Sequence, residues 1–140
     1  MDFDKQMAEL FRDEDSAREM AHKLMELAKR DPRAAALEKD SLLAFLRGPM
    51  ERHMAFEERA LFPALAQHGL GPEVEVATKH HATLRNEAAA LEHASSPEEA
   101  ARAVFLAARL MLHHTNFEGD YIYPELNREQ WHALLRATKT

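Results

Sequence analysis

Two histidine–glutamate pairs with identical spacing carry the strongest chemical signal in the sequence. His53 precedes Glu57 and His114 precedes Glu118, both in the pattern His-x-x-x-Glu. Residues i and i+4 lie on one face of an α-helix, so each pair can present a nitrogen and a carboxylate oxygen to the same point. A single pair is also an ordinary helical ion pair, but two pairs at matching registers indicate a metal site.

A third histidine falls in the same register of a different helical segment. His81 lies on an apolar stripe with Ala77 and Leu84. Carboxylates buried without partners in such a core cost about several kcal/mol each. A pair of cations bridged by the two glutamates would offset that cost, and imidazole with carboxylate suits iron, manganese or zinc. The predicted metal ligands are therefore His53, Glu57, His81, His114 and Glu118.

The elements that must position these residues are helices. Apolar residues recur at helical spacing almost throughout, and no alternating strand pattern is present. Gly and Pro punctuation separates four long segments and a tail, at about residues 3–30, 32–68, 73–94, 96–123 and 127–140. Ser96 is the expected N-cap of the fourth segment, with Pro97 at its first position. The pattern predicts an all-α, up-down-up-down antiparallel four-helix bundle with a short C-terminal helix, as a single domain over residues 1–140.

The inward stripe of a helix in a bundle steps alternately by three and four residues. The stripe of the second segment is predicted to contain Leu43, Leu46, Met50, His53, Glu57, Ala60 and Ala64. That of the fourth segment is predicted to contain Ala100, Val104, Ala107, Met111, His114, Glu118 and Tyr121. Three residues next to the predicted ligands are candidates for contacts with them, namely His80, His113 and Tyr121.

These motifs resemble the hemerythrin-like, or HHE cation-binding, family. The resemblance rests on residues 53–63, 81–85 and 114–124, and the first and last of these runs also match each other at Phe62 and Tyr123. It implies a non-haem di-iron centre inside the bundle, with an oxo or hydroxo bridge, two bridging glutamates and mostly histidine terminal ligands. Manganese or zinc are the alternative metals.

The first helix departs from the family pattern, which places an inward histidine there. The inward stripe here contains Glu14 as its only charged residue, between Leu10 and Ala17. The only histidine of the segment, His22, lies about 200° around the helix from Leu24. We predict Glu14 as the first-helix ligand, with His22 as the alternative.

Three functions are consistent with these residues. The resemblance implies a di-iron protein that binds or senses oxygen, peroxide or nitric oxide, or that handles iron. An alternative is a di-iron oxidase or a peroxide-consuming enzyme, so turnover stays open. A metal-free helical interaction module is the third, but it leaves Glu57 and Glu118 without a reason to be buried.

Composition excludes several other classes. The absence of cysteine excludes a thiolate zinc site, a cysteine nucleophile and an iron–sulfur cluster. A net charge of −6 argues against a nucleic-acid partner. The longest apolar run, residues 103–108, is too short to span a membrane. We expect a cytoplasmic monomer or small homo-oligomer whose partner is a small diatomic molecule or peroxide.

Overall fold

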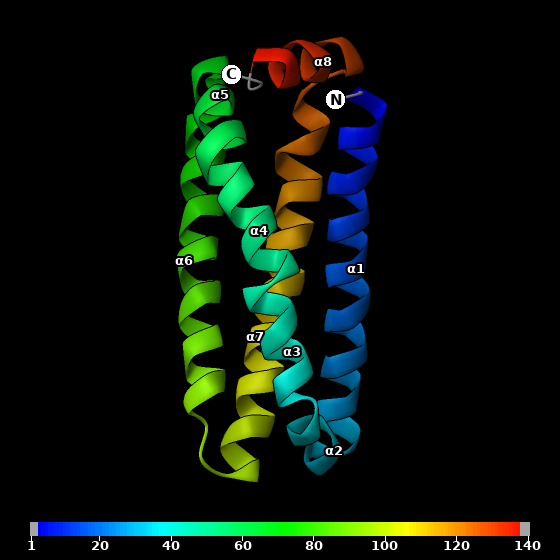
Figure 1. Ribbon diagram of the computed structural model, residues 1–140, viewed down its shortest axis with the longest axis vertical. Coiled ribbons are helices and arrows are strands. Elements are labelled where there is room, and N and C mark those ends of the chain that lie inside the picture. The colour runs from blue at the N-terminus through cyan, green and yellow to red at the C-terminus, as the bar shows by residue number, and fades with distance from the viewer. Residues whose placement is uncertain (1–2, 138–140) are drawn as a thin grey trace.

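A computed structural model describes residues 3–137 as an antiparallel bundle of helices with one helix lying across its end (Figure 1). Three long helices form three of its sides: α1 (Phe3–Arg30), α6 (Gly71–His93) and α7 (Pro97–Tyr121). The short helix α8 (Arg128–Ala137) crosses the end where both termini lie. Residues 3–137 contain no strand, so the predicted fold class is confirmed.

The fourth side of the bundle is a broken rod, and the prediction of one uninterrupted helix over residues 32–68 is wrong. It consists of α2 (Pro32–Leu37), α3 (Lys39–Arg47), α4 (Pro49–Phe56), a π-turn (Glu57–Leu61), α5 (Phe62–Leu65) and a second π-turn (Ala66–Leu70). Gly48 leaves the helical conformation at φ −104° and ψ −98°, because Pro49 has no N–H and disfavours a helical residue before it. Upstream of this break, Leu42 is buried and the predicted Leu43 only half-buried.

The π-turn changes which residues face the core after Glu57. Leu61 and Leu65 are buried, whereas the predicted Ala60 and Ala64 are half-buried. A π-turn closes its hydrogen bond over five residues rather than four, so one extra residue enters the turn. The inward stripe therefore advances by one position relative to an ordinary α-helix.

Side-chain caps begin α2, α7 and α8. Asp31 accepts a hydrogen bond from the Ala34 N–H at 3.2 Å before α2. Ser96 accepts from the Glu99 N–H at 3.1 Å, which confirms the predicted cap of α7. Glu99 in turn accepts from the Ser95 N–H at 3.0 Å. These hydrogen bonds satisfy backbone N–H groups at the helix starts that have no partner inside the helix.

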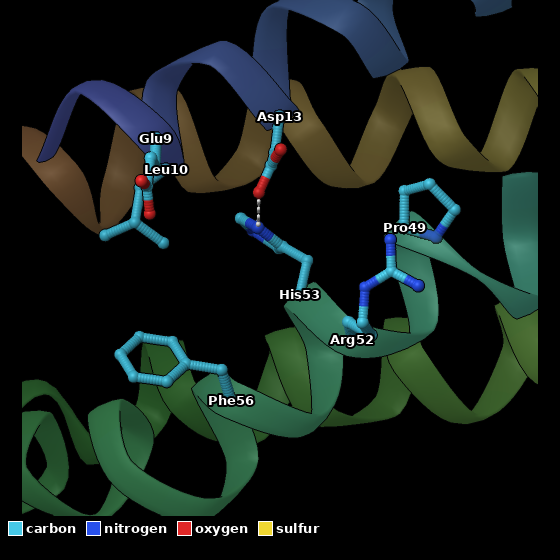
Figure 2. A pocket seen from close by; sticks show the side chains of 7 residues that line it. All are labelled: Glu9, Leu10, Asp13, Pro49, Arg52, His53 and Phe56. Carbon is cyan, nitrogen blue, oxygen red and sulfur yellow. Dashed lines mark hydrogen bonds and ion pairs between the residues drawn. The ribbon is translucent and has the colours of Figure 1, made fainter. Parts of the chain in front are cut away.

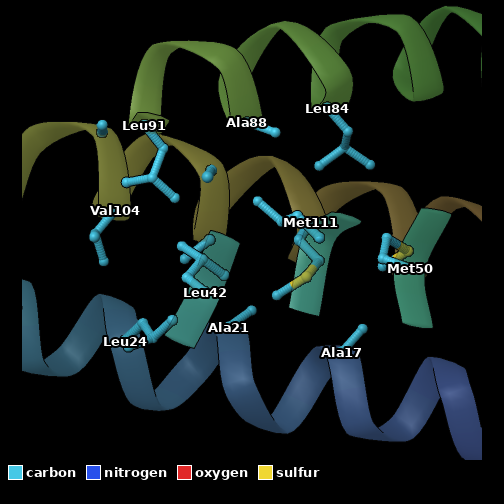
Figure 3. Close-up of a cluster of buried hydrophobic side chains, with 14 of the residues drawn as sticks. Ala17, Ala21, Leu24, Leu42, Met50, Leu84, Ala88, Leu91, Val104 and Met111 are labelled. Carbon is cyan, nitrogen blue, oxygen red and sulfur yellow. The ribbon is translucent and has the colours of Figure 1, made fainter. Parts of the chain in front are cut away.

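The apolar core has two parts, separated along the bundle axis. Figure 3 shows the first, in which all four sides of the bundle contribute, including Ala17, Leu24, Leu42, Met50, Leu84, Leu91 and Met111. The second lies toward α8 and includes Leu10, Leu61, Phe62, Leu65, Ile122 and Trp131. Between the two parts, each side of the bundle carries polar residues on its inward stripe.

The C-terminal helix closes the second part of the core. Trp131 is 3% exposed, and its indole N–H donates to the carbonyl oxygen of Tyr123 at 3.0 Å. The predicted tail helix is thus confirmed as far as Ala137, and residues 138–140 lie outside the described residues. None of the helices described is both long and apolar enough to cross a membrane.

Candidate metal centre

The polar level between the two apolar clusters consists of six inward histidines and glutamates. In α1 this level follows Leu10 and precedes Ala17, and in α6 it lies between Ala77 and Leu84. All of its members are at most 7% exposed: Glu14, His53, Glu57, His81, His114 and Glu118. The sequence had placed each of them on an inward stripe.

These residues form two overlapping groups in which the potential ligand atoms lie within 4.8 Å of one another. One group contains His81 and His114, and the other contains Glu14 and His53. Glu57 and Glu118 belong to both groups. A carboxylate has two oxygens, so Glu57 and Glu118 could each serve as a ligand in either group.

The three imidazoles all turn the same ring nitrogen inward. Nε2 of His53 lies 3.1 Å from Oε1 of Glu14 and 3.5 Å from Oε1 of Glu57. Nε2 of His81 lies 3.2 Å from the same Glu57 oxygen. Nε2 of His114 contacts Oε1 of Glu118. The ring nitrogens and carboxylate oxygens thus converge on one small volume.

Several of these converging atoms have no hydrogen-bond partner among the described residues. They include Oε2 of Glu14, Nε2 of His81, Nε2 of His114 and both carboxylate oxygens of Glu118. Buried polar atoms in proteins are nearly always satisfied, and leaving one unpaired costs about 1–3 kcal/mol. Bound cations would satisfy all of these atoms together, so the residues present fit a metal site.

Without a cation, protons must balance the buried charges. Burial and the adjacent negative charge of Glu57 raise the pKa of Glu118 well above its usual value. Burial also acts to raise the pKa of Glu57, but its close contacts with Glu118, His53 and His81 hold it well below the usual value. Burial acts to lower the pKa of His53, yet Glu14 and Glu57 raise it to about 11. In the metal-free site these shifts favour the protonated forms of Glu118 and His53.

The outer edge of His53 faces a cavity between α1 and α4. Its Nδ1 lies 3.1 Å from Oδ2 of Asp13, which reaches down from α1 (Figure 2). The cavity has a volume of about 280 Å³ and is also lined by Leu10, Arg52 and Phe56. Solvent or a small molecule can thus approach the outer side of this histidine.

The other two histidines have outer partners of different charge. Nδ1 of His81 lies 2.6 Å from Oε2 of Glu58, a residue that the sequence did not assign to the ligand set. Nδ1 of His114 lies 3.1 Å from Nδ1 of His80, and burial lowers the pKa of His80, so this partner is a neutral imidazole. His113 is exposed, and its ring packs on His80 at 5.0 Å between centroids.

Comparison with known families adds one decisive observation. Residues 6–96 match the Hemerythrin HHE cation binding domain, and they make up more than half of the 140 residues. The chain belongs to this family. The matched region ends before α7 and so does not include His114 and Glu118. It is the three-dimensional arrangement that places these two residues in the buried groups. The chain has no significant match among curated proteins or solved structures.

In this hemerythrin HHE domain the first helix contributes a carboxylate to the buried level. Glu14 is 3% exposed and belongs to one of the two groups. His22 is exposed on the outside of α1 and belongs to neither group. The helical register that favoured Glu14 over His22 therefore matches the position of both side chains.

The tyrosine that reaches the HHE site is not the one on the predicted stripe. Tyr121 is 57% exposed, so its predicted inward position is wrong. The α-helix ends at Tyr121, and the chain continues through a 3₁₀ turn over Tyr123–Glu125. The hydroxyl of Tyr123 donates to Oε2 of Glu57 at 3.3 Å. The sequence did contain a signal for Tyr123. Residues 53–63 and 114–124 match each other, and this match pairs Tyr123 with Phe62, which is buried.

Proposed function

We propose that this protein holds two iron ions inside the bundle, bridged by Glu57 and Glu118. His81 and His114 would complete the ligands of one ion, and Glu14 and His53 those of the other. The observation that carries the proposal is the sharing of two buried carboxylates by two adjacent ligand groups. In a hydrogen-bonded core these polar atoms would be paired, whereas Nε2 of His81, Nε2 of His114 and both oxygens of Glu118 have no hydrogen-bond partner among the described residues.

Iron is the proposed metal because the donor set suits it and because the chain belongs to the hemerythrin HHE family. The donor set contains imidazole nitrogens and carboxylate oxygens, and the chain has no cysteine to attract softer ions. Manganese and zinc can use the same donors and are the alternatives that a competition experiment must address.

We further propose that the centre binds or senses a small molecule, namely oxygen, peroxide or nitric oxide, or handles iron itself. Each ligand group contains four residues, which leaves coordination positions open for a small molecule. Iron, when bound, supplies the affinity and redox chemistry for such ligands. The protein contributes burial, which excludes bulk water, and fixed imidazole orientations through contacts at their outer nitrogens.

An anaerobic Fe²⁺ titration with elemental analysis tests this function. We expect about two ions per chain, matching the two ligand groups. Absorption spectra after exposure to oxygen, peroxide, nitric oxide or azide should then change in the loaded protein and not in a Glu57→Gln/Glu118→Gln variant. A stoichiometry near zero, or preferential retention of zinc in competition, would contradict the iron proposal.

A further inference from the structure

One of the three inward histidines is held far more firmly than the others. His81 is fully buried, and its two ring nitrogens face carboxylates on opposite edges. Its ring also stacks on Phe62 at 5.3 Å between centroids, with an angle of 23° between the ring planes. Both the position and the rotation of this imidazole are therefore fixed.

Glu58 determines which nitrogen of His81 is available inside. Two N–H groups of the Arg85 guanidinium donate to the two oxygens of Glu58, so this carboxylate is ionised in an ion pair. An ionised carboxylate can only accept, so Nδ1 of His81 must carry the hydrogen that is shared with Glu58 over 2.6 Å. The lone pair of a neutral His81 then lies on Nε2, which faces Glu57.

Glu58 is itself held by an arginine that comes from the same helix as His81. Arg85 Nη1 donates to Oε2 of Glu58 at 2.8 Å, and Nη2 donates to Oε1 at 3.2 Å. The Nε of Arg85 donates to Glu51 at 3.0 Å. A planar guanidinium fixed by two carboxylates has little rotational freedom. The result is a continuous series of contacts, Glu51–Arg85–Glu58–His81.

The other outer contacts lack this support. Asp13, the partner of His53, has a side chain that is 51% exposed, whereas that of Glu58 is 31% exposed. The partner of His114 is another imidazole, that of His80, and not a carboxylate. Among the three, only His81 has a charge-assisted bond to a carboxylate that is itself held by an arginine.

We infer that Glu58, held by Arg85, is a positioning residue that orients His81 and strengthens its Nε2 as a metal ligand. This inference rests on the proposed function, because it assumes that His81 binds metal. Outer carboxylates of this kind fix the tautomer of the imidazole and increase its basicity, and losing one lowers metal affinity by about 10- to 100-fold.

Cobalt(II) binding to the full-length protein tests this role, with Glu58→Gln and Glu51→Gln as a matched pair. Both variants remove one carboxylate from Arg85, but only Glu58 touches His81. We expect the Co²⁺ affinity to fall about tenfold or more in Glu58→Gln and to stay near the wild-type value in Glu51→Gln. Equal affinities in all three proteins, or equal losses in both variants, would overturn the inference.

Proton NMR of the Co²⁺ form provides a readout that a purely structural role would not move. The exchangeable Nδ1 proton of His81 should give a hyperfine-shifted resonance that moves or disappears in Glu58→Gln and persists in Glu51→Gln. Arg85→Met, which leaves the Glu58–His81 contact in place, should show an intermediate affinity. If the wild-type protein binds no Co²⁺ or Fe²⁺, the proposed function fails. If it binds and the Glu58→Gln resonance is unchanged, only this inference fails.

Discussion

The hydroxyl of Tyr123 donates a hydrogen bond to Oε2 of Glu57 across 66 residues of sequence, at 3.3 Å. Burial, together with the neighbouring carboxyl groups of Glu118 and Glu57, raises the pKa of Tyr123 well above its usual value, so the hydroxyl keeps its proton. Trp131 of α8 in turn donates to the Tyr123 carbonyl oxygen. The C-terminal helix is thereby connected to the buried carboxylates through one tyrosine.

Replacing Tyr123 by phenylalanine should destabilise the metal-free protein. The change leaves Oε2 of Glu57 buried without its donor, so we expect the free energy of unfolding to fall by about 1–3 kcal/mol. Urea unfolding followed by circular dichroism measures this. Tyr121→Phe is the matched control, because Tyr121 is 57% exposed. Equal effects of the two changes would show that the hydrogen bond contributes nothing.

Glu14 and His22 should differ sharply in their effect on metal content. Glu14→Gln removes a carboxylate ligand from one of the two groups, so we expect one of the two ions to be lost or bound much more weakly. His22→Gln changes an exposed residue and should keep the full metal content. Elemental analysis after iron loading decides between them. Loss of metal in His22→Gln alone would mean that the register of α1 differs in the loaded protein.

Replacing either of the two shared glutamates should weaken the binding of both metal ions. Glu57 and Glu118 each belong to both groups, so Glu57→Gln and Glu118→Gln should each weaken binding of both ions. Glu26→Gln, at an exposed position of α1, is the control with the same change in charge. Isothermal titration with Fe²⁺ measures the affinities. Retention of one ion at wild-type affinity in either shared-residue variant would argue against bridging.

Metal affinity should rise with pH. In the metal-free protein the pKa of His53 is raised to about 11 and that of Glu118 lies well above its usual value. Both shifts favour the protonated forms, and these protons must leave when the atoms bind a cation. Affinity should increase about tenfold per pH unit for each proton released. Zn²⁺ titrations in buffers of different ionisation enthalpy count those protons, and a pH-independent affinity would contradict the assignment.

Removing metal should lower stability without unfolding the bundle. The two apolar clusters lie on either side of the site and do not depend on it. At a free metal concentration one hundred times Kd, binding adds about 2.7 kcal/mol to the native state. The melting temperature should therefore rise on loading by on the order of 10 °C. In Glu118→Gln the melting temperature should not rise when metal is added. Identical melting temperatures for the metal-free and metal-loaded wild-type protein would contradict metal binding.

Helical periodicity alone placed most of the candidate site. The buried residues of α6 are the predicted stripe, including Ala77, His81 and Leu84. On α1 the same argument placed Glu14 inside and His22 outside, as the structure has them. These predictions hold because α1, α6 and α7 are uninterrupted helices, in which spacing along the sequence determines direction around the axis. Their role as metal ligands stays a prediction.

Only the tertiary structure decided the residues that lie where periodicity fails or where two helices meet. The π-turn after His53 moved the core stripe to Leu61, and the end of α7 brought Tyr123 inside in place of Tyr121. The contact of Glu58 with His81 depends on how two helices face each other, which no spacing within one helix encodes. The sequence determined which residues face the bundle axis within each unbroken helix, because that direction is local. The partners across the axis depend on packing and on backbone irregularities, which are not local.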